Sequence, residues 1–314
     1  MLYCMKSKCH HSSEAGRMAR QTMNPSIRYL IGVDGGGTGT RIRLHASDGT
    51  PLAMAEGGAS ALSQGIAKSW QAVLSTLEAA FQQAGLPAAP ASACAIGLGL
   101  SGVHNRQWAG EFESQAPGFA RLSLATDGYT TLLGAHGGQP GIIVALGTGS
   151  IGEALYPDGS HREAGGWGYP SGDEASGAWL GQRAAQLTQM ALDGRHSHSP
   201  LTRAVLDFVG GDWQAMMAWN GRATPAQFAR LAPLVLSAAR VDPEADALLR
   251  QAGEDAWAIA RALDPQDELP VALCGGLGQA LRDWLPPGFR QRLVAPQGDS
   301  AQGALLLLQR PSTR

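Results

Sequence analysis

The chain has 314 residues, with 24 lysines and arginines against 26 aspartates and glutamates, and a formal net charge of −2. This balance leaves no basic surface for nucleic acid or for an anionic membrane, so neither is expected as a partner. With 44% hydrophobic and 16% charged residues, the chain can form one large domain or two smaller ones.

Residues 1–26 are predicted to be a disordered polar leader, because they lack the apolar core of a signal peptide. The leader holds four potential metal ligands, Cys4, Cys9, His10 and His11, whose spacing matches no common structural zinc site. Cys94 and Cys274 stand in apolar runs, where free cysteine behaves as a small buried hydrophobe. No apolar run reaches the roughly 18 residues of a transmembrane helix. We therefore expect a cytoplasmic protein without a disulfide framework.

A buried strand is predicted over residues 29–33, and it leads into a glycine-rich loop. The loop reads Asp34-Gly35-Gly36-Gly37-Thr38-Gly39-Thr40. An alternating strand follows, and the turn at 48–51 can lead into a third strand over 52–56.

Glycines in such a loop let backbone N–H groups approach an anion closely, and threonine hydroxyls add donors. The loop lacks the spacing of a P-loop and of the Rossmann fingerprint. It can nevertheless hold phosphate through Gly36, Gly37 and Thr38, while Asp34 can hold hydrated Mg²⁺. A plain glycine-rich hairpin is the alternative.

The same strand–loop–strand pattern occurs a second time. Residues 141–146 form an apolar strand, followed by the loop Gly147-Thr148-Gly149-Ser150 and another strand. At one constant offset, six pairs match: Gly37 with Gly147, Thr38 with Thr148, Gly39 with Gly149, Thr40 with Ser150, Asp48 with Asp158, and Gly49 with Gly159. The matches predict an internal structural repeat, with two unrelated hairpins as the alternative. Two facing loops would grip the phosphates of a nucleotide from both sides.

Helices are predicted between and after these hairpins. The predicted helices cover residues 69–84, 225–239, 245–263 and 300–309, and further strands cover 93–100, 121–126 and 271–274. This alternation predicts α/β domains with largely buried sheets. A third loop, Gly275-Gly276-Leu277-Gly278, follows the late strand and can lie beneath a purine and its ribose.

Asp127 directly follows the predicted strand 121–126. The carboxyl ends of strands are where open α/β sheets place ligands, and a carboxylate there can accept the proton of an attacking hydroxyl. Asp is also a strong helix N-cap residue, so a purely structural cap is the alternative.

The order of the three loops, with Asp127-Gly128 between the first and the second, resembles the actin, hexokinase and Hsp70 superfamily. The segment Gly165-Gly166-Trp167-Gly168-Tyr169-Pro170-Ser171-Gly172-Asp173-Glu174 further resembles the N-acetylglucosamine and glucosamine kinases of the BadF/BadG/BcrA/BcrD ATPase family, over roughly residues 31–308. The resemblance implies two ribonuclease H-like α/β lobes of the actin-like ATPase superfold, with ligands in the cleft between them. The N-terminal lobe would span 27–126 with a returning C-terminal helix at 296–314, and the C-terminal lobe 127–295.

The resemblance also implies a function and its residues. The expected reaction is ATP- and Mg²⁺-dependent phosphorylation of an amino sugar, N-acetylglucosamine or glucosamine, at O6. Phosphate binding would fall on the first two loops, including Gly147, Thr148 and Gly149, nucleoside binding on Gly275 and Gly276, and base catalysis on Asp127. The sugar site would include Ser60, Ala61, Gly166, Trp167, Gly168 and Asp173. Family members are often homodimers.

One position departs from the family. Members usually carry Asn where this chain has Ala61, so the identity of the amino sugar stays open. A kinase of the repressor/ORF/kinase group normally has a cysteine-rich zinc loop, which this sequence lacks. A second alternative is an activator ATPase of 2-hydroxyacyl-CoA dehydratases, which needs thiolates for an iron–sulfur cluster. A third is a non-enzymatic sugar sensor with the same fold, which would not need a catalytic base.

Overall fold

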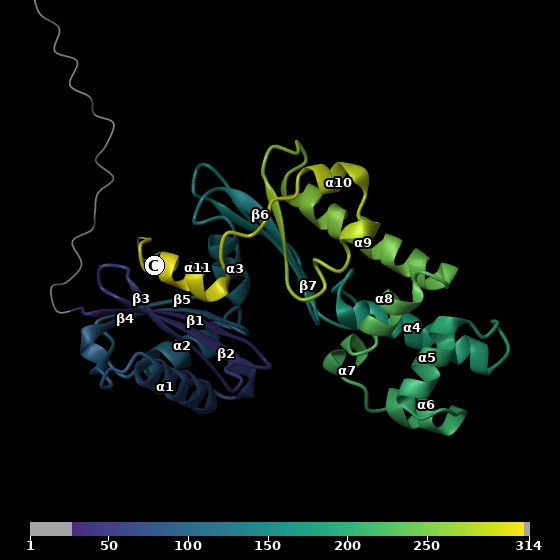
Figure 1. Cartoon of the computed structure of the whole chain (residues 1–314), viewed down its shortest axis with the longest axis horizontal. Coiled ribbons are helices and arrows are strands. Elements are labelled where there is room, and N and C mark those ends of the chain that lie inside the picture. The colour runs from purple at the N-terminus through teal and green to yellow at the C-terminus, as the bar shows by residue number, and fades with distance from the viewer. Residues whose placement is uncertain (1–26, 311–314) are drawn as a thin grey trace, which may run out of the picture.

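The computed structural model describes residues 27–310. The leader, with its cysteines and histidines, and residues 311–314 lie outside the described residues. Two sheets, each covered by helices, make up the described chain (Figure 1), which confirms the predicted α/β class. Within residues 27–310, no helix combines the length and the apolarity needed to cross a membrane.

The first sheet contains five strands and includes every strand predicted before residue 127. Strands β1, β4 and β5 are parallel, so their carboxyl ends meet at one edge of the sheet. In spatial order the strands are β3 (Pro51–Gly57), β2 (Thr40–Ala46), β1 (Tyr29–Gly35), β4 (Cys94–Leu100) and β5 (Arg121–Ala125).

Helix α1 (Ile66–Gln83) packs on β2 and β3, and α2 (Arg106–Ser114) packs against α1. The predicted start of α1, residue 69, is three residues late. Its buried face includes Val73, Leu77 and Phe81, as the apolar spacing predicts.

The second sheet repeats the strand order of the first. In spatial order its strands are β8 (His161–Gly165), β7 (Ser150–Leu155), β6 (Gly141–Leu146) and β9 (Val271–Cys274). Both sheets thus run from an antiparallel three-stranded meander to a parallel strand. An isolated parallel bridge from Val271 to Leu293 occupies the place that β5 has in the first sheet. The predicted internal repeat is therefore confirmed in the topology, although β8 itself was not predicted.

Seven further helices belong to the second half of the described chain, and of these α9 packs on the second sheet while α4, α5, α7 and α8 pack on one another. They are α4 (Gly177–Leu192), α5 (Pro200–Val209), α6 (Trp213–Asn220), α7 (Pro225–Ala229), α8 (Ala232–Ala238), α9 (Pro243–Leu263) and α10 (Pro287–Gln291). The single helix predicted over 225–239 is wrong, because α7 ends at Ala229 and α8 begins at Ala232. Pro233 lies in the first turn of α8, where its missing N–H is tolerated. The predicted helix 245–263 begins earlier, because Asp242 caps α9.

Two helices lie against each other between the sheets: α3 (Asp127–Ala135) and α11 (Ser300–Leu307) (Figure 1). A Cβ on Gly134 would lie 2.0 Å from the carbonyl oxygen of Asp299, and one on Gly303 would lie 1.7 Å from that of Thr130. The hydroxyls of Thr130 and Ser300 form a hydrogen bond of 2.8 Å. Only glycine permits so close a crossing of the two backbones.

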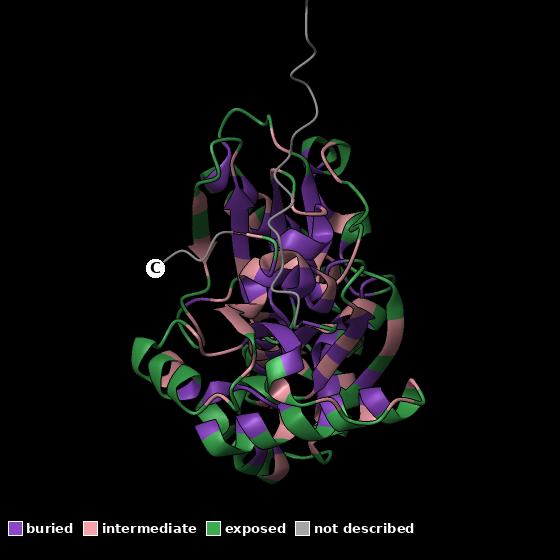
Figure 2. Ribbon diagram, turned by 90° about the vertical axis from the view of Figure 1, so that its left-hand side faces the viewer, coloured by how far each residue is buried: buried purple, intermediate pink, exposed green. Residues whose placement is uncertain are grey.

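Helix α11 also packs on the first sheet, against β1 and β4. A Cβ on Gly97 of β4 would lie 1.9 Å from the carbonyl oxygen of Ala304, so the helix backbone touches the strand directly. Helix α3 packs on β6 and β7 through Leu132 and Leu133, which share a buried cluster with Ile143. The strands and these two helices form the buried centre, and the outer helices expose one face (Figure 2).

The crossing of α3 and α11 predicts the effect of Gly303→Ala. The added methyl group has no room beside Thr130, and overpacking of this kind destabilises by about 1–3 kcal/mol. The free energy of unfolding, measured in urea, should fall by that amount. Gly110→Ala in α2 is the control, because a Cβ there meets nothing within 4 Å and alanine favours helix by up to about 1 kcal/mol. Equal stability of the two variants would contradict the tight crossing.

Candidate functional site

The first glycine-rich loop is held from below by its own backbone and by the segment before α1. Gly36 N–H donates to the carbonyl oxygen of Gly39 at 2.9 Å, and the carbonyl oxygen of Gly36 accepts from the N–H groups of Ser60 and Ala61 at 3.1 and 3.2 Å. Gly37 and Thr38, at the tip, are exposed. The loop is thus fixed at its base and open at the tip, as a phosphate-binding loop requires.

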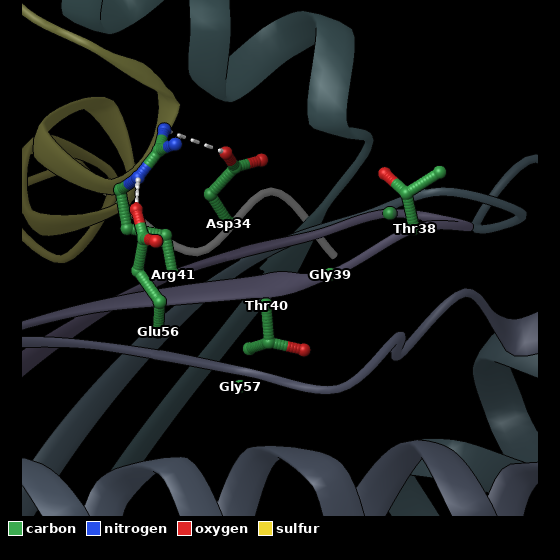
Figure 3. Close-up of a pocket in the computed structure, with 8 residues that line it drawn as sticks. Asp34, Thr38, Gly39, Thr40, Arg41, Glu56 and Gly57 are labelled. Carbon is green, nitrogen blue, oxygen red and sulfur yellow. Dashed lines mark hydrogen bonds and ion pairs between the residues drawn. The ribbon is translucent and has the colours of Figure 1, made fainter.

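Beside this loop lies a cavity of about 320 Å³, lined by Asp34, Gly36, Thr38, Gly39, Thr40, Arg41, Glu56 and Gly57. Arg41 reaches from β2 to Asp34 on one side, at 3.7 Å, and to Glu56 on the other, at 3.2 Å (Figure 3). Burial raises the pKa of Asp34, against a hydrogen bond with Ser300 and the charge of Arg41. A half-buried carboxylate with a single distant cation fits a hard divalent ion such as Mg²⁺.

Asp127 is the first residue of α3, directly after β5. The N-cap of α3 is Thr126, whose hydroxyl accepts from the N–H of Tyr129 at 3.0 Å, so the cap interpretation of Asp127 is wrong. Its carboxylate accepts from the adjacent N–H of Gly128 at 3.1 Å. Burial raises the pKa of Asp127, opposed by hydrogen bonds from backbone N–H groups and by the charge of His104.

Asp127 and Asp34 are near enough for the charge of Asp127 to raise the pKa of Asp34. The sheet explains this, because both residues lie at the edge where the carboxyl ends of β1, β4 and β5 meet. The first loop, the carboxylate suited to Mg²⁺ and the predicted base therefore belong to one group at one edge of the first sheet.

A second group forms at the edge of the second sheet. The carbonyl oxygen of Gly147 accepts from Gly177 N–H at 2.8 Å, and that of Thr148 accepts from Ala178 N–H at 3.1 Å. The start of α4 thereby holds the second loop.

Asp173 joins the segment 165–174 to the second loop. It adopts a left-handed backbone conformation, with φ of 61°, and its carboxylate accepts from Gly168 N–H at 3.2 Å. A Cβ on Gly149 would lie 2.7 Å from the same carboxylate, which places Asp173 directly against the second loop. Burial raises the pKa of Asp173, against hydrogen bonds from the N–H groups of Gly168 and Ser150.

Trp167 stands out of this segment with 86% of its surface exposed. It lies between Gly166 and Gly168, both of which have positive φ. So large an exposed indole beside polar groups is available to stack on a ligand.

The third loop closes against the second. Gly275, with φ of 80°, lies against the carbonyl oxygen of Leu146, which also accepts from Leu277 N–H at 3.0 Å. Gly276 is open on the side where a Cβ would stand. The structure thus brings the second loop, the third loop and the segment with Trp167 into one group, as the order of motifs predicts.

Ser60 and Ala61, which the resemblance places in the sugar site, are both buried within the protein. Ser60 is fully buried, and its hydroxyl accepts from Thr40 at 2.7 Å. Ala61 is buried as well, and the N–H groups of both residues support the first loop. Their polar groups are therefore used within the protein, and contact with a sugar stays a prediction.

Sequence reasoning missed a set of polar side chains beside Asp127. Glu153 of β7 is fully buried beneath the start of α3, where a Cβ on Gly128 would lie 1.8 Å from its Oε1. His161 and Glu163 of β8 lie on the same face. Glu153 lies in the strand predicted after the second loop, whereas His161 and Glu163 lie in β8, which was not predicted.

Comparisons with known proteins place these features in context. The model of the BadF/BadG/BcrA/BcrD ATPase family matches residues 31–307. A glucosamine kinase of Vibrio cholerae is 33% identical over 286 residues, which are 91% of this chain and 97% of that protein. An N-acetylmuramic acid/N-acetylglucosamine kinase of Clostridium acetobutylicum is 24% identical over 302 residues, covering 90% and 98%.

A crystal structure from Porphyromonas gingivalis, provisionally named an N-acetylglucosamine kinase, matches with a TM-score of 0.67 at 19% identity. The match covers 90% of this chain and 98% of that chain. At this level of identity the likeness concerns the fold.

The backbone of Asp173 predicts a difference between two substitutions. Asp173→Ala should destabilise by about 1–2 kcal/mol, because alanine is strained in the left-handed region, and it also removes the bond to Gly168. Asp173→Asn should be close to the wild type, since Asn tolerates this conformation and its amide oxygen can still accept. Thermal unfolding measures both variants, and equal midpoints for Ala and Asn would contradict the role of this conformation.

Proposed function

The chain belongs to the BadF/BadG/BcrA/BcrD ATPase family, and from this premise we propose that it is a sugar kinase which transfers the γ-phosphoryl group of ATP to O6 of glucosamine or N-acetylglucosamine. The actin-like ATPase superfold predicted for the chain is confirmed. The observation that carries the proposal is the position of Asp127. Its side chain does not cap α3, it is half-buried, and it lies beside Asp34 and the first loop.

The reaction needs little covalent work from the protein, so positioning and charge stabilisation dominate. The hydroxyl oxygen of the sugar attacks the γ-phosphorus, its bond to the bridging oxygen of ADP breaks, and Asp127 takes the hydroxyl proton. Gly36, Gly37 and Thr38 would hold the phosphates from the first sheet, and the loop from Gly147 to Gly149 from the second.

The remaining assignments follow from the two groups of loops. Asp34 would hold Mg²⁺, which when bound neutralises phosphate charge. Gly275 and Gly276 would lie beneath the nucleoside, and Trp167 would stack on the apolar face of the sugar ring. Gly166, Gly168 and Asp173 would shape that side of the site. Such an arrangement needs a cleft between the lobes 27–126 and 127–295, with the helix at 296–314 returned to the first lobe.

The alternative as a dehydratase activator finds little support in the described thiols. Burial raises the pKa of both Cys94 and Cys274 to about 11, and a thiolate, not a thiol, ligates iron. Free thiols together with the use of ATP favour a cytoplasmic location. Homodimerisation stays a prediction.

A coupled assay of ADP release tests the substrate class. The sugars to compare are glucosamine, N-acetylglucosamine, N-acetylmannosamine and glucose, with a reaction lacking sugar as the control. ADP release with glucosamine or N-acetylglucosamine should stand well above that with glucose. Equal rates with and without every amino sugar would overturn the kinase proposal in favour of a bare ATPase or a sensor.

Substitution of Asp127 by Asn tests its role as the base. The amide cannot take the proton, so kcat should fall at least about 10²-fold, while sugar affinity changes far less. Burial raises the pKa of Asp127. As the pH is lowered, the wild-type kcat should therefore begin to fall at a pH higher than the ordinary pKa of an aspartate. This fall on the acid side should be absent in Asp127→Asn.

The same raised pKa has a consequence for stability. The fold loses stability as the pH rises from the ordinary pKa of an aspartate through the raised pKa of Asp127, because the unfolded chain ionises first. At pH 7 Asp127→Asn should therefore be at least as stable as the wild type. Asp158→Asn is the matched control, since Asp158 lies in an exposed turn and should leave kcat unchanged. Normal turnover by a folded Asp127→Asn variant would remove Asp127 from the mechanism.

A further inference from the structure

The face of the second sheet that meets α3 carries three side chains with the chemistry of metal ligands. Glu153 of β7 lies directly opposite Glu163 of β8 in the strand register, and His161 lies two residues before Glu163. All three therefore project from the same face of the sheet. One ligand atom from each lies within 4.8 Å of the others.

A fourth group reaches this cluster from the other half of the fold. His104, in the segment after β4, places its Nε2 at 3.1 and 3.0 Å from the two carboxylate oxygens of Glu163. The Nε2 of His161 lies 2.8 Å from Oε2 of Glu153. One imidazole and two carboxylates thus form the cluster, and His104 contacts it through Glu163.

The charges in this cluster are poorly compensated. Like charges directly opposite one another in a sheet are destabilising, and the side chain of Glu153 is wholly buried. Within residues 27–310, its Oε1 has no hydrogen-bond partner. A buried carboxylate oxygen left without a partner carries the desolvation penalty of that group. A cation between the carboxylates would offset both effects.

We propose that Glu153, His161 and Glu163 bind a divalent transition metal ion such as Zn²⁺, with His104 as an outer hydrogen-bond partner of Glu163 and the fourth position left to water. Ligands about 2.0–2.1 Å from zinc in a tetrahedron stand roughly 3.3 Å apart, a spacing that the three ligand atoms can reach from their present positions within 4.8 Å of one another. Imidazole selects zinc, copper or nickel over magnesium. The site is therefore chemically distinct from Asp34.

The ring of His161 is further oriented by the helix above it. It packs edge-on against Tyr129 of α3, with ring centroids 4.7 Å apart. Because His104 follows β4 and hydrogen-bonds Glu163, the ion site on the second sheet is linked through Glu163 to the segment after β4. This link lies beside Asp127, which also feels the charge of His104.

The test measures zinc binding to the full chain after removal of metal with a chelator, with neither nucleotide nor sugar present. Isothermal titration with Zn²⁺ should give one ion per chain at this site. His161→Ala and Glu163→Gln should each weaken the affinity at least about tenfold, because even outer partners of metal ligands contribute about that much. Zn²⁺ should also raise the unfolding temperature of the wild type more than that of either variant.

Three control variants separate this site from other zinc ligands. Replacement of Cys4, Cys9, His10 and His11 together tests the leader, Asp34→Asn tests the proposed magnesium site, and Glu111→Gln removes an exposed glutamate of α2. All three should leave one zinc ion bound with the wild-type affinity at the proposed site.

Two outcomes would overturn the proposal: zinc affinity unchanged in both His161→Ala and Glu163→Gln, or zinc binding abolished by the leader variant. Should His161→Ala fail to fold, Glu163→Gln decides, since its side chain is 36% exposed and its removal of charge leaves the sheet intact. The measurement uses neither ATP nor sugar. A negative result would therefore overturn the zinc site without bearing on the kinase proposal, and the reverse also holds.

Discussion

The close crossing of α3 and α11 is the contact on which the arrangement of both sheets depends. Helix α11 follows the outermost strand position of the second sheet and packs on the first, whereas α3 follows β5 of the first sheet and packs on strands of both sheets. The two halves are therefore held together by these exchanged helices. Glycine on each helix lets the backbones touch. The start of α3 presents Asp127, and the cap of α11, Asp299, forms a two-bonded ion pair with Arg43 of β2 at 2.8 and 3.0 Å. The crossing that joins the halves therefore also positions the edge of the first sheet at which Asp34 and Asp127 lie.

The site is built from acids whose charge is only partly neutralised. Burial raises the pKa of Asp34, Asp127, Glu153 and Asp173 alike. Buried acids with a raised pKa reduce the stability of the fold at neutral pH, and such acids cluster at functional sites. Their destabilising effect is tolerated because rigid elements on both sheets hold them: the ends of β1 and β5, the middle of β7, and the backbone of Asp173.

Sequence patterns predicted most strands and the repeat, because apolar runs bounded by glycine report on local structure. They predicted the order of the loops, and hence the family, but not which polar groups are free. That Ser60 supports the first loop depends on contacts between distant segments. That Thr126 rather than Asp127 caps α3 depends on the residue at which the helix begins, which the sequence pattern leaves uncertain by one or two residues. The cluster around Glu153 depends on strand register, which no local pattern specifies. The break between α7 and α8 was missed because one proline suits a first turn as well as a loop.

The exchanged helices bear on how the chain matures during translation. Arg43 and its partner Asp299 stand 256 positions apart, and the surface of β1 and β4 around Gly97 is covered by α11. The ribosome releases the first sheet long before α11 emerges, at about 5–20 residues per second. Until the second sheet and α11 have been synthesised, that surface of β1 and β4 stays exposed to solvent or is bound by a chaperone. Native assembly of the first half therefore waits until α11 has been made.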